Sequence, residues 1–249
     1  MSGSKVKVGC CGFPLRKAQY AERFPVVEVQ ETFYQPPRLA TLQRWREQMP
    51  PEFEFTVKAW QLITHFASSP TYKRLKAQLS ELERRGCGGF QPQAIVHEAW
   101  LATRACAQAL DARMVLFQCP ASFAPTRQNV AHLRDFFLCI NRGHLRLLWE
   151  PRGDWPEVLI EPLCRELHLI HVVDPFIRRS VTRDFFYYRL HGGENYQHRF
   201  SDLELRQLLA VLPPDKQAYV MFNNHGMLED AERFRNLLEG RERELRQAA

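Results

Sequence analysis

Eight short runs of β-branched and apolar residues recur along the chain, separated by turns and by stretches with helical periodicity. Strand–helix alternation favours a parallel sheet, and eight such units close naturally into a barrel of about 250 residues. The 249 residues of the chain match that size. The sequence therefore predicts an α/β fold, a single (β/α)8 TIM-type barrel domain over 1–249. We place its strands at 5–10, 26–31, 54–59, 113–118, 145–150, 169–174, 185–191 and 217–223, and its main helices at 39–48, 98–110, 129–140, 158–167, 203–212 and 228–238.

The connection after the third predicted strand, residues 61–93, is the main irregularity of the pattern. It contains His65, a charged segment at 72–85 with helical character, and a glycine-rich break at 86–89. We interpret this segment as a helical insertion after strand three that covers the mouth of the barrel.

Composition narrows the class of protein further. No run approaches the roughly 18 apolar residues that a membrane span needs, and the N-terminus lacks the layout of an export signal. We therefore expect a cytoplasmic protein without a membrane partner. The seven cysteines include no C-x-x-C pair, which favours reduced thiols in the core. A net charge of +6 is compatible with a polyanionic partner, and the sequence carries no signal for an oligomeric state.

Polar side chains stand at the C-terminal end of almost every predicted strand. Period-two alternation places Glu28, Gln30 and Thr32 on one face of the second strand, and Arg189 and His191 on one face of the seventh. If these faces point inward, a lysine, an arginine, a histidine and three carboxylates converge at the barrel mouth, where active sites of this fold lie. The strand-end residues are Glu28, Gln30, Lys58, Gln118, Glu150, Asp174, Arg189, His191, Asn223 and Asn224.

Buried charges are costly unless they pair with one another or with a ligand. The strand ends therefore form either a functional site or a plug of mutually satisfied charges. Lys58 has three open roles: a Schiff-base nucleophile, a phosphate clamp, or an ion-pair partner of Glu28. The candidate catalytic residues are Lys58, Glu150, Asp174, His191 and Glu28, and the candidate substrate-binding residues are Tyr34, His65, Gln118, Arg152, Trp155, Arg189, Asn223 and Asn224.

Nine short strand-end motifs give the chain a resemblance to a known family over nearly its whole length. They are Gly9-Cys10-Cys11-Gly12-Phe13, Val27-Glu28-Val29, Thr32-Phe33-Tyr34, Phe55-Thr56-Val57-Lys58-Ala59, Thr64-His65, Phe117-Gln118-Cys119-Pro120, Glu150-Pro151-Arg152 with Trp155, Arg189-Leu190-His191-Gly192 and Phe222-Asn223-Asn224. In this order they resemble the DUF72, or YecE-like, family. The resemblance implies a TIM-type barrel distantly similar to the xylose isomerase and endonuclease IV group. The first motif of the family usually carries Thr-Ser and a following Trp, where this chain has Cys10-Cys11 and Phe13.

The first functional hypothesis is an enzyme that acts on damaged bases or abasic sites in DNA. Aromatic residues flank the polar strand ends and provide stacking surfaces, while arginines match phosphate. In this hypothesis Glu150 or Asp174 activates water or stabilises a cationic sugar, His191 shuttles protons, and Lys58 attacks C1′ of an abasic sugar. Asn223, Asn224 and Gln118 would read the base edge.

Two alternatives stay open. The same lysine, histidine and carboxylates suit a small-molecule isomerase, hydrolase or lyase acting on an anionic substrate such as a sugar phosphate. The third hypothesis is a non-catalytic binding protein. Either no cofactor is needed, or Glu150, Asp174 and His191 on neighbouring strands hold a single divalent metal ion.

Overall fold

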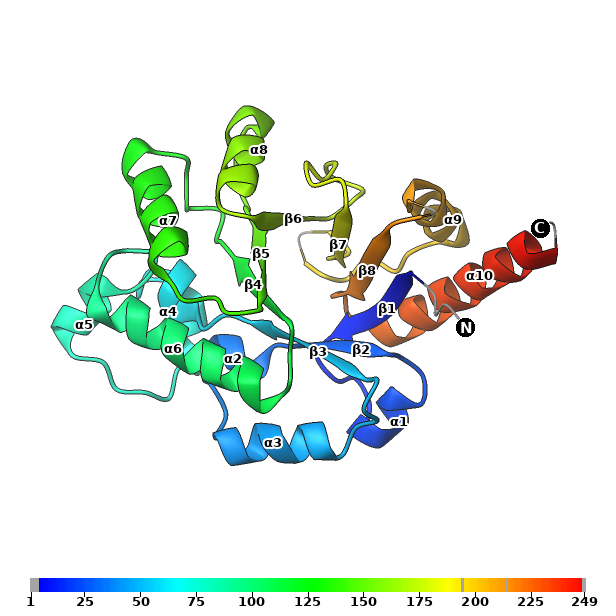
Figure 1. The fold of residues 1–249 in the computed structure, drawn as a ribbon, viewed down its shortest axis with the longest axis horizontal. Helices are drawn as coiled ribbons and strands as arrows, with labels where there is room; N and C mark the ends of the chain where they lie inside the picture. Colours follow the sequence, from blue (N-terminus) through cyan, green and yellow to red (C-terminus); the bar gives the residue numbers. More distant parts are fainter. Residues whose placement is uncertain (1–4, 194, 214, 248–249) are drawn as a thin grey trace.

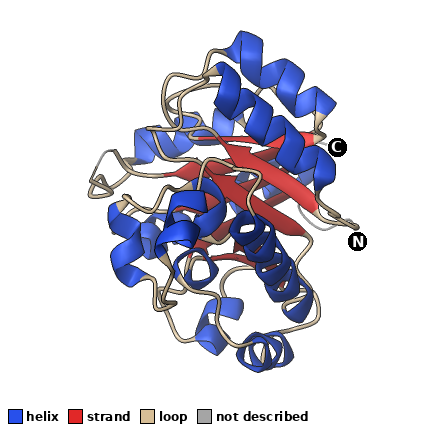
Figure 2. Cartoon of the chain, turned by 90° about the vertical axis from the view of Figure 1, so that its left-hand side faces the viewer, coloured by secondary structure: helices blue, strands red, loops and turns tan. Residues whose placement is uncertain are grey.

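The computed structural model describes residues 5–193, 195–213 and 215–247. Its eight strands are all parallel and follow one another in chain order around a closed barrel, with β8 pairing back to β1. Figures 1 and 2 show the strands inside and the helices around them. The predicted (β/α)8 fold is confirmed. The strands are β1 (Val6–Cys11), β2 (Val26–Val29), β3 (Glu54–Lys58), β4 (Met114–Gln118), β5 (Arg146–Glu150), β6 (Leu169–Val173), β7 (Phe185–Leu190) and β8 (Gln217–Phe222).

Helices follow most of the strands, but the alternation is not complete. The connection from β6 to β7, residues 174–184, contains no helix. It is short, and Pro175 stands at its beginning. The helices are α1 (Lys17–Ala21), α2 (Glu31–Tyr34), α3 (Leu39–Glu47), α4 (Gln61–Thr64), the 3-10 helix η1 (Pro70–Arg74), α5 (Glu81–Gly86), α6 (Ala94–Ala109), α7 (Arg127–Cys139), α8 (Glu157–Glu166), α9 (Asp202–Val211) and α10 (Met227–Gln247).

The insertion after β3 is helical, but the prediction of one charged helix over 72–85 is wrong. The segment holds η1 and the short α5, with irregular backbone at 75–80 between them. Ser80 explains the break, because its side chain accepts a hydrogen bond from the Glu83 amide while the Glu83 side chain bonds back to Ser80. This capping box fixes an extended backbone at Ser80, so α5 begins there.

Strand β2 ends earlier than the sequence predicted, which changes the position of two side chains. It stops at Val29, and Glu31 begins α2. The side chain of Thr32 does not extend the inward face: its hydroxyl donates to the carbonyl of Lys58 at 2.7 Å. Gln30 turns back instead, and its amide donates to Glu28 at 2.5 Å.

The core has two parts, one between strands and helices and one inside the barrel. The interior is filled by apolar and aromatic side chains, so the charged residues inside it gather near the strand ends. The interior cluster is Cys11, Val26, Met114, Leu116, Leu148, Val172, Phe185, Tyr187, Tyr219 and Met221.

Three further observations bear on the expectations from composition. All seven cysteines are free thiols, and only Cys139 is exposed. None of the helices in the described ranges is long and apolar enough to span a membrane. The localisation expectation drew on the N-terminus, of which Met1–Ser4 lie outside the described residues.

Candidate active site

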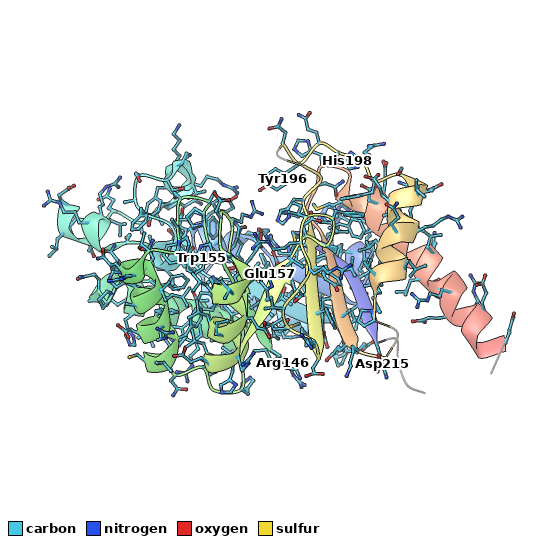
Figure 3. All side chains as sticks on the ribbon, turned by 90° about the horizontal axis from the view of Figure 1, so that it is seen from above. Arg146, Trp155, Glu157, Tyr196, His198 and Asp215 are labelled. Atoms are coloured by element: carbon cyan, nitrogen blue, oxygen red, sulfur yellow. The ribbon has the colours of Figure 1, made fainter. Side chains whose placement is uncertain are left out.

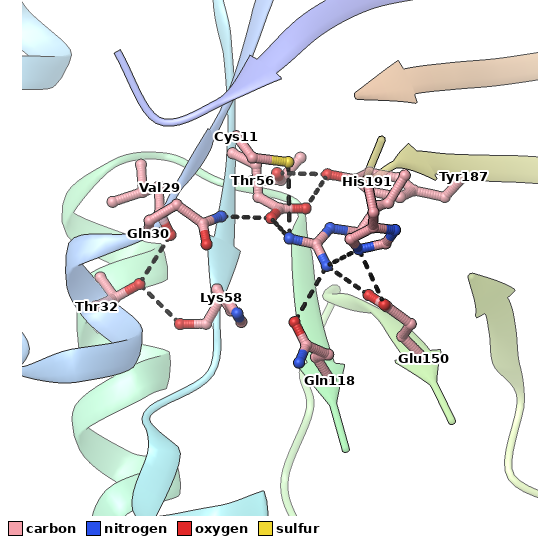
Figure 4. A network of polar contacts seen from close by, with 12 residues as sticks. Cys11, Val29, Gln30, Thr32, Thr56, Lys58, Gln118, Glu150, Tyr187 and His191 are labelled. Atoms are coloured by element: carbon pink, nitrogen blue, oxygen red, sulfur yellow. Dashed lines mark hydrogen bonds and ion pairs between the residues drawn. The ribbon is translucent and has the colours of Figure 1, made fainter. Parts of the chain in front are cut away.

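The guanidinium of Arg189 is the centre of a polar network at the C-terminal end of the barrel (Figure 4). Arg189 comes from β7 and has no solvent exposure. It donates to Glu28 at 2.9 Å, to Glu150 at 2.6 Å and to Gln118 at 3.2 Å. Burial alone would lower the pKa of Arg189, but the two carboxylates outweigh burial and raise it. Arg189 therefore stays charged and holds β2, β4 and β5 together.

Glu28 is buried beneath the barrel mouth and is fully occupied by donors. One oxygen accepts from Arg189 and from the Gln30 amide, and the other accepts from the Tyr187 hydroxyl at 2.8 Å. The Tyr187 hydroxyl also lies 2.9 Å from that of Thr56. Such a carboxylate is well suited to fixing the position of Arg189.

Glu150 forms the second half of the network. It accepts from Arg189 and, at 2.8 Å, from Arg152. Burial would raise the pKa of Glu150, but these two guanidiniums hold it well below its usual value. The ring of His191 lies 3.3 Å from Glu150 and 3.7 Å from Asp174, and its backbone amide donates to Asp174 at 3.1 Å. The six predicted charged groups thus do converge, and Arg189 and His191 share one face as predicted.

The arrangement of Glu150, Asp174 and His191 does not fit a metal site. The oxygens of Glu150 already accept from two guanidiniums, and both oxygens of Asp174 accept from backbone amides. Within the described ranges, no group of three or more histidine, cysteine, aspartate or glutamate side chains is placed to hold a metal ion. We derive no chemical step through a metal at these residues.

Lys58, at the end of β3, differs from the other charged residues of the site. Among the residues that the structure describes, no carboxylate pairs with its amine and no hydrogen-bond acceptor contacts it. Figure 4 shows only its carbonyl joined to a neighbour, Thr32. The amine lies 4.0 Å from the ring centre of Phe33. Burial, assisted by the charge of Arg189, lowers the pKa of Lys58 to about 7. Of its three open roles, ion pairing with Glu28 is excluded by this geometry, because Arg189 occupies that carboxylate.

A cavity of about 370 Å³ opens above Lys58. His65 from the insertion lines it, with its ring 4.9 Å from that of Phe33. Burial and the nearby Lys58 lower the pKa of His65 to about 3, so its imidazole is neutral at pH 7. Gly88, with φ +82°, packs against the His65 backbone so closely that a Cβ would lie 2.3 Å from the carbonyl carbon of His65. The glycine-rich break therefore lets the insertion place His65 over the mouth.

The predicted substrate-binding residues fall into three groups. Tyr34, His65, Gln118, Asn223 and Asn224 line the cavity, as expected for contact with a ligand. The Asn224 amide also donates to Asp230 and to the carbonyl of His198, which ties it to the fold.

Arg189 and Arg152 lie in the charged network, where Arg152 also bonds to the Tyr196 hydroxyl at 3.1 Å. Trp155 is placed differently from what the sequence indicated. It is buried against Phe123 and Trp149, and its indole donates to the carbonyl of Phe123 at 2.6 Å. Its surroundings are those of a packing residue.

Sequence reasoning missed several residues of the site. Tyr187 lies two positions before Arg189, so the alternation that placed Arg189 inward would have placed Tyr187 inward too. Gln30 was predicted, but not its bond to Glu28. Cys11, with its sulfur 3.7 Å from Arg189, lines the cavity where the family pattern usually has a hydroxyl. No pattern marked Thr71 or Met227, because long connections bring them to the cavity.

The fold and the converging strand ends define a TIM-barrel protein whose candidate site lies at the C-terminal mouth. The chain belongs to the DUF72 family, described as "Protein of unknown function DUF72", whose sequence profile matches residues 15–249. It is 24% identical to the UPF0759 protein YunF of Bacillus subtilis (strain 168) over 88% of this chain and 84% of that protein.

Solved structures agree with this family. A DUF72 family protein from Enterococcus faecalis V583 matches with a TM-score of 0.71 and 21% identity, over 94% of this chain and 97% of that chain. One from Thermotoga maritima MSB8 matches with a TM-score of 0.68 and 23% identity, over 94% and 99%. The fold also extends to D-psicose 3-epimerase, with a TM-score of 0.54 over 93% and 97% of the two chains, and to endonuclease IV from Thermus thermophilus, with 0.51 over 94% and 99%, both at 12% identity.

Proposed function

We propose that this chain is an enzyme in which Lys58 forms a Schiff base with the aldehyde carbon of an open-chain sugar, and that the sugar is the abasic deoxyribose of DNA. One observation carries the proposal: the Lys58 amine faces the cavity without a carboxylate partner among the described residues, and its pKa is lowered to about 7. A lysine of this kind is largely neutral near pH 7 to 8 and is therefore a nucleophile. Structural lysines instead keep a partner or reach solvent.

The chemistry balances with groups that the chain supplies. The Lys58 amine adds to C1′, the addition product takes up a proton and loses water, and an imine remains. The imine makes the C2′ proton acidic. When a base removes that proton, its electron pair forms a carbon–carbon double bond, and the C3′–O bond breaks to release the phosphate. Hydrolysis of the imine then regenerates Lys58. His191, between Asp174 and Glu150, is the proposed proton shuttle, and Arg189 keeps Lys58 from being protonated.

Cations at the rim of the mouth support DNA as the substrate. Lys73, Arg74 and Lys76 on the insertion are exposed and form no ion pair with any residue in the described ranges. The guanidinium of Arg74 stacks 3.4 Å above the ring of Tyr34, which lines the cavity. A cation beside an aromatic ring suits a phosphate followed by a base or sugar. The shared fold with endonuclease IV is consistent with this substrate and adds no residue-level argument.

Borohydride trapping tests the proposal. The protein is incubated with an end-labelled duplex that contains one abasic site, and borohydride reduces any imine to a stable adduct. We expect the adduct with the wild type and with Lys216→Met, a lysine paired with Asp184 at the other end of the barrel, and none with Lys58→Met. An adduct that persists in Lys58→Met would overturn the assignment of Lys58.

A free sugar or sugar phosphate is the second candidate substrate, because the lining of the cavity favours it. The cavity is small, and the described residues that line it include no arginine, aspartate or glutamate. Amide groups of Gln30, Gln118 and Asn223 suit neutral hydroxyl groups. Trapping of a free aldose through Lys58, without trapping of abasic DNA, would select this substrate and retain the mechanism.

A further inference from the structure

A second, larger cavity lies at the opposite end of the barrel, where the strands begin. Its volume is about 840 Å³. Figure 3 shows the separation: Arg146, which lines this cavity, lies at the end of the molecule opposite Tyr196, which lines the upper one. This end of a TIM barrel ordinarily serves stability, so a cavity rich in charged residues needs an explanation.

Two arginines stand side by side in this cavity without a counter-charge from the described residues. Arg113 precedes β4 and Arg146 begins β5, and the Arg146 amide donates to the Arg113 carbonyl at 2.9 Å. Neither guanidinium forms an ion pair with a residue in the described ranges. Arg146 instead lies 4.8 Å from the ring centre of Phe185 and 3.5 Å from the amide oxygen of Gln217. Like charges placed together repel, so an anion between them would be stabilising.

The other charged groups of the cavity leave these two arginines available. Glu54 is satisfied by Lys7 at 2.6 Å and by the Tyr219 hydroxyl at 2.6 Å. Arg46 is held by three backbone carbonyls of residues 49–53. Glu52 and Asp111 also line the cavity, but both are exposed. The floor beneath is aromatic, with the rings of Phe185 and Tyr219 5.3 Å apart, and an apolar floor strengthens the field of the charges above it.

We propose that this lower cavity binds a small phosphate-bearing anion through Arg113 and Arg146. Guanidinium forks match the oxygens of phosphate, and two adjacent forks match a diphosphate. The site does not depend on the function proposed for Lys58, since neither arginine contacts the upper cavity. It is a binding site, and no reaction is assigned to it.

Calorimetric titration of the full chain with inorganic pyrophosphate tests the proposal. We expect saturable binding at one site, weakened at least tenfold in the double variant Arg113→Gln/Arg146→Gln. The control Arg127→Gln/Arg206→Gln removes two exposed arginines elsewhere and should leave binding unchanged. Absence of saturable binding, or equal weakening in the control, would overturn the site.

A parallel titration with an undamaged single-stranded oligonucleotide distinguishes the source of the phosphate. Pyrophosphate binding that depends on the two arginines more strongly than oligonucleotide binding supports a small anion. The reverse result would contradict it. Trapping at Lys58 should be equal in the wild type and the double variant, which keeps this test separate from that of the proposed enzyme.

Discussion

Replacing Arg189 with methionine tests the structural role of the central guanidinium. Methionine matches the length of the aliphatic stem but supplies no donor. The change removes the bonds of 2.9 Å to Glu28 and 2.6 Å to Glu150, and leaves two buried carboxylates in its place. Glu28 retains the Tyr187 hydroxyl, and Glu150 retains Arg152, so each carboxylate loses one donor and not all of them.

The expected cost follows from these contacts. A hydrogen bond to a charged group contributes about 1.5–3 kcal/mol, and removing one partner of a buried ion pair costs about 3–5 kcal/mol. We therefore expect Arg189→Met to lower the free energy of unfolding by about 3–5 kcal/mol. For a chain of this size that corresponds to a Tm lower by roughly 6–20 °C.

Urea denaturation of the variants measures this cost. The triple variant Arg189→Met/Glu28→Gln/Glu150→Gln removes all three charges and should recover most of the loss, because no unpaired charge stays buried. If Arg189→Met cost less than about 1 kcal/mol, or if the triple variant were less stable than the single one, the assigned role of Arg189 would be refuted.

Three further substitutions give distinct outcomes. Lys58→Met should stabilise the protein at pH 7, and its advantage should shrink as pH rises from about 7 towards 10, because over that range the unfolded wild type binds more protons than the folded one; urea denaturation at several pH values measures this, and a constant difference would contradict it. Gly88→Ala should cost about 2 kcal/mol or more, since a Cβ would meet the His65 backbone; a Tm equal to that of the wild type would count against it. Tyr187→Phe should cost about 1–3 kcal/mol because it removes the donor to Glu28, and an unchanged midpoint in urea would argue that this bond contributes little.

The sequence was sufficient for the fold and for the location of the site. Parallel strands in a closed barrel all end at the same side, so polar residues at strand ends converge wherever the exact boundaries fall. Lys58, Glu150 and Arg189 were found in this way. The roles within the cluster required the structure, because they depend on which groups pair: Glu28 and Lys58 were equally plausible partners until Arg189 was seen to occupy Glu28.

Residues outside the strands were predicted less well, for a physical reason. Trp155 follows a strand end closely in sequence, yet packs into the core, because an indole gains more from burial against Phe123 than from exposure at the mouth. Period-two alternation also fails as soon as the strand ends, which is why Thr32 was placed on the wrong face. Long connections such as the one that carries Thr71 have no period from which to predict their contacts.

The protonation of Lys58 is the central claim of this account, and an NMR titration of the lysine side chains measures it most directly. The Cε and Hε signals of an isotope-labelled sample are followed from pH 5 to pH 11, and Lys58→Met assigns the signal of Lys58. We predict that this signal titrates near pH 7, while an exposed lysine such as Lys73 titrates near its usual value of about 10.4. A Lys58 signal that titrates together with the exposed lysines would contradict the account, because the amine would then be protonated and unreactive at neutral pH.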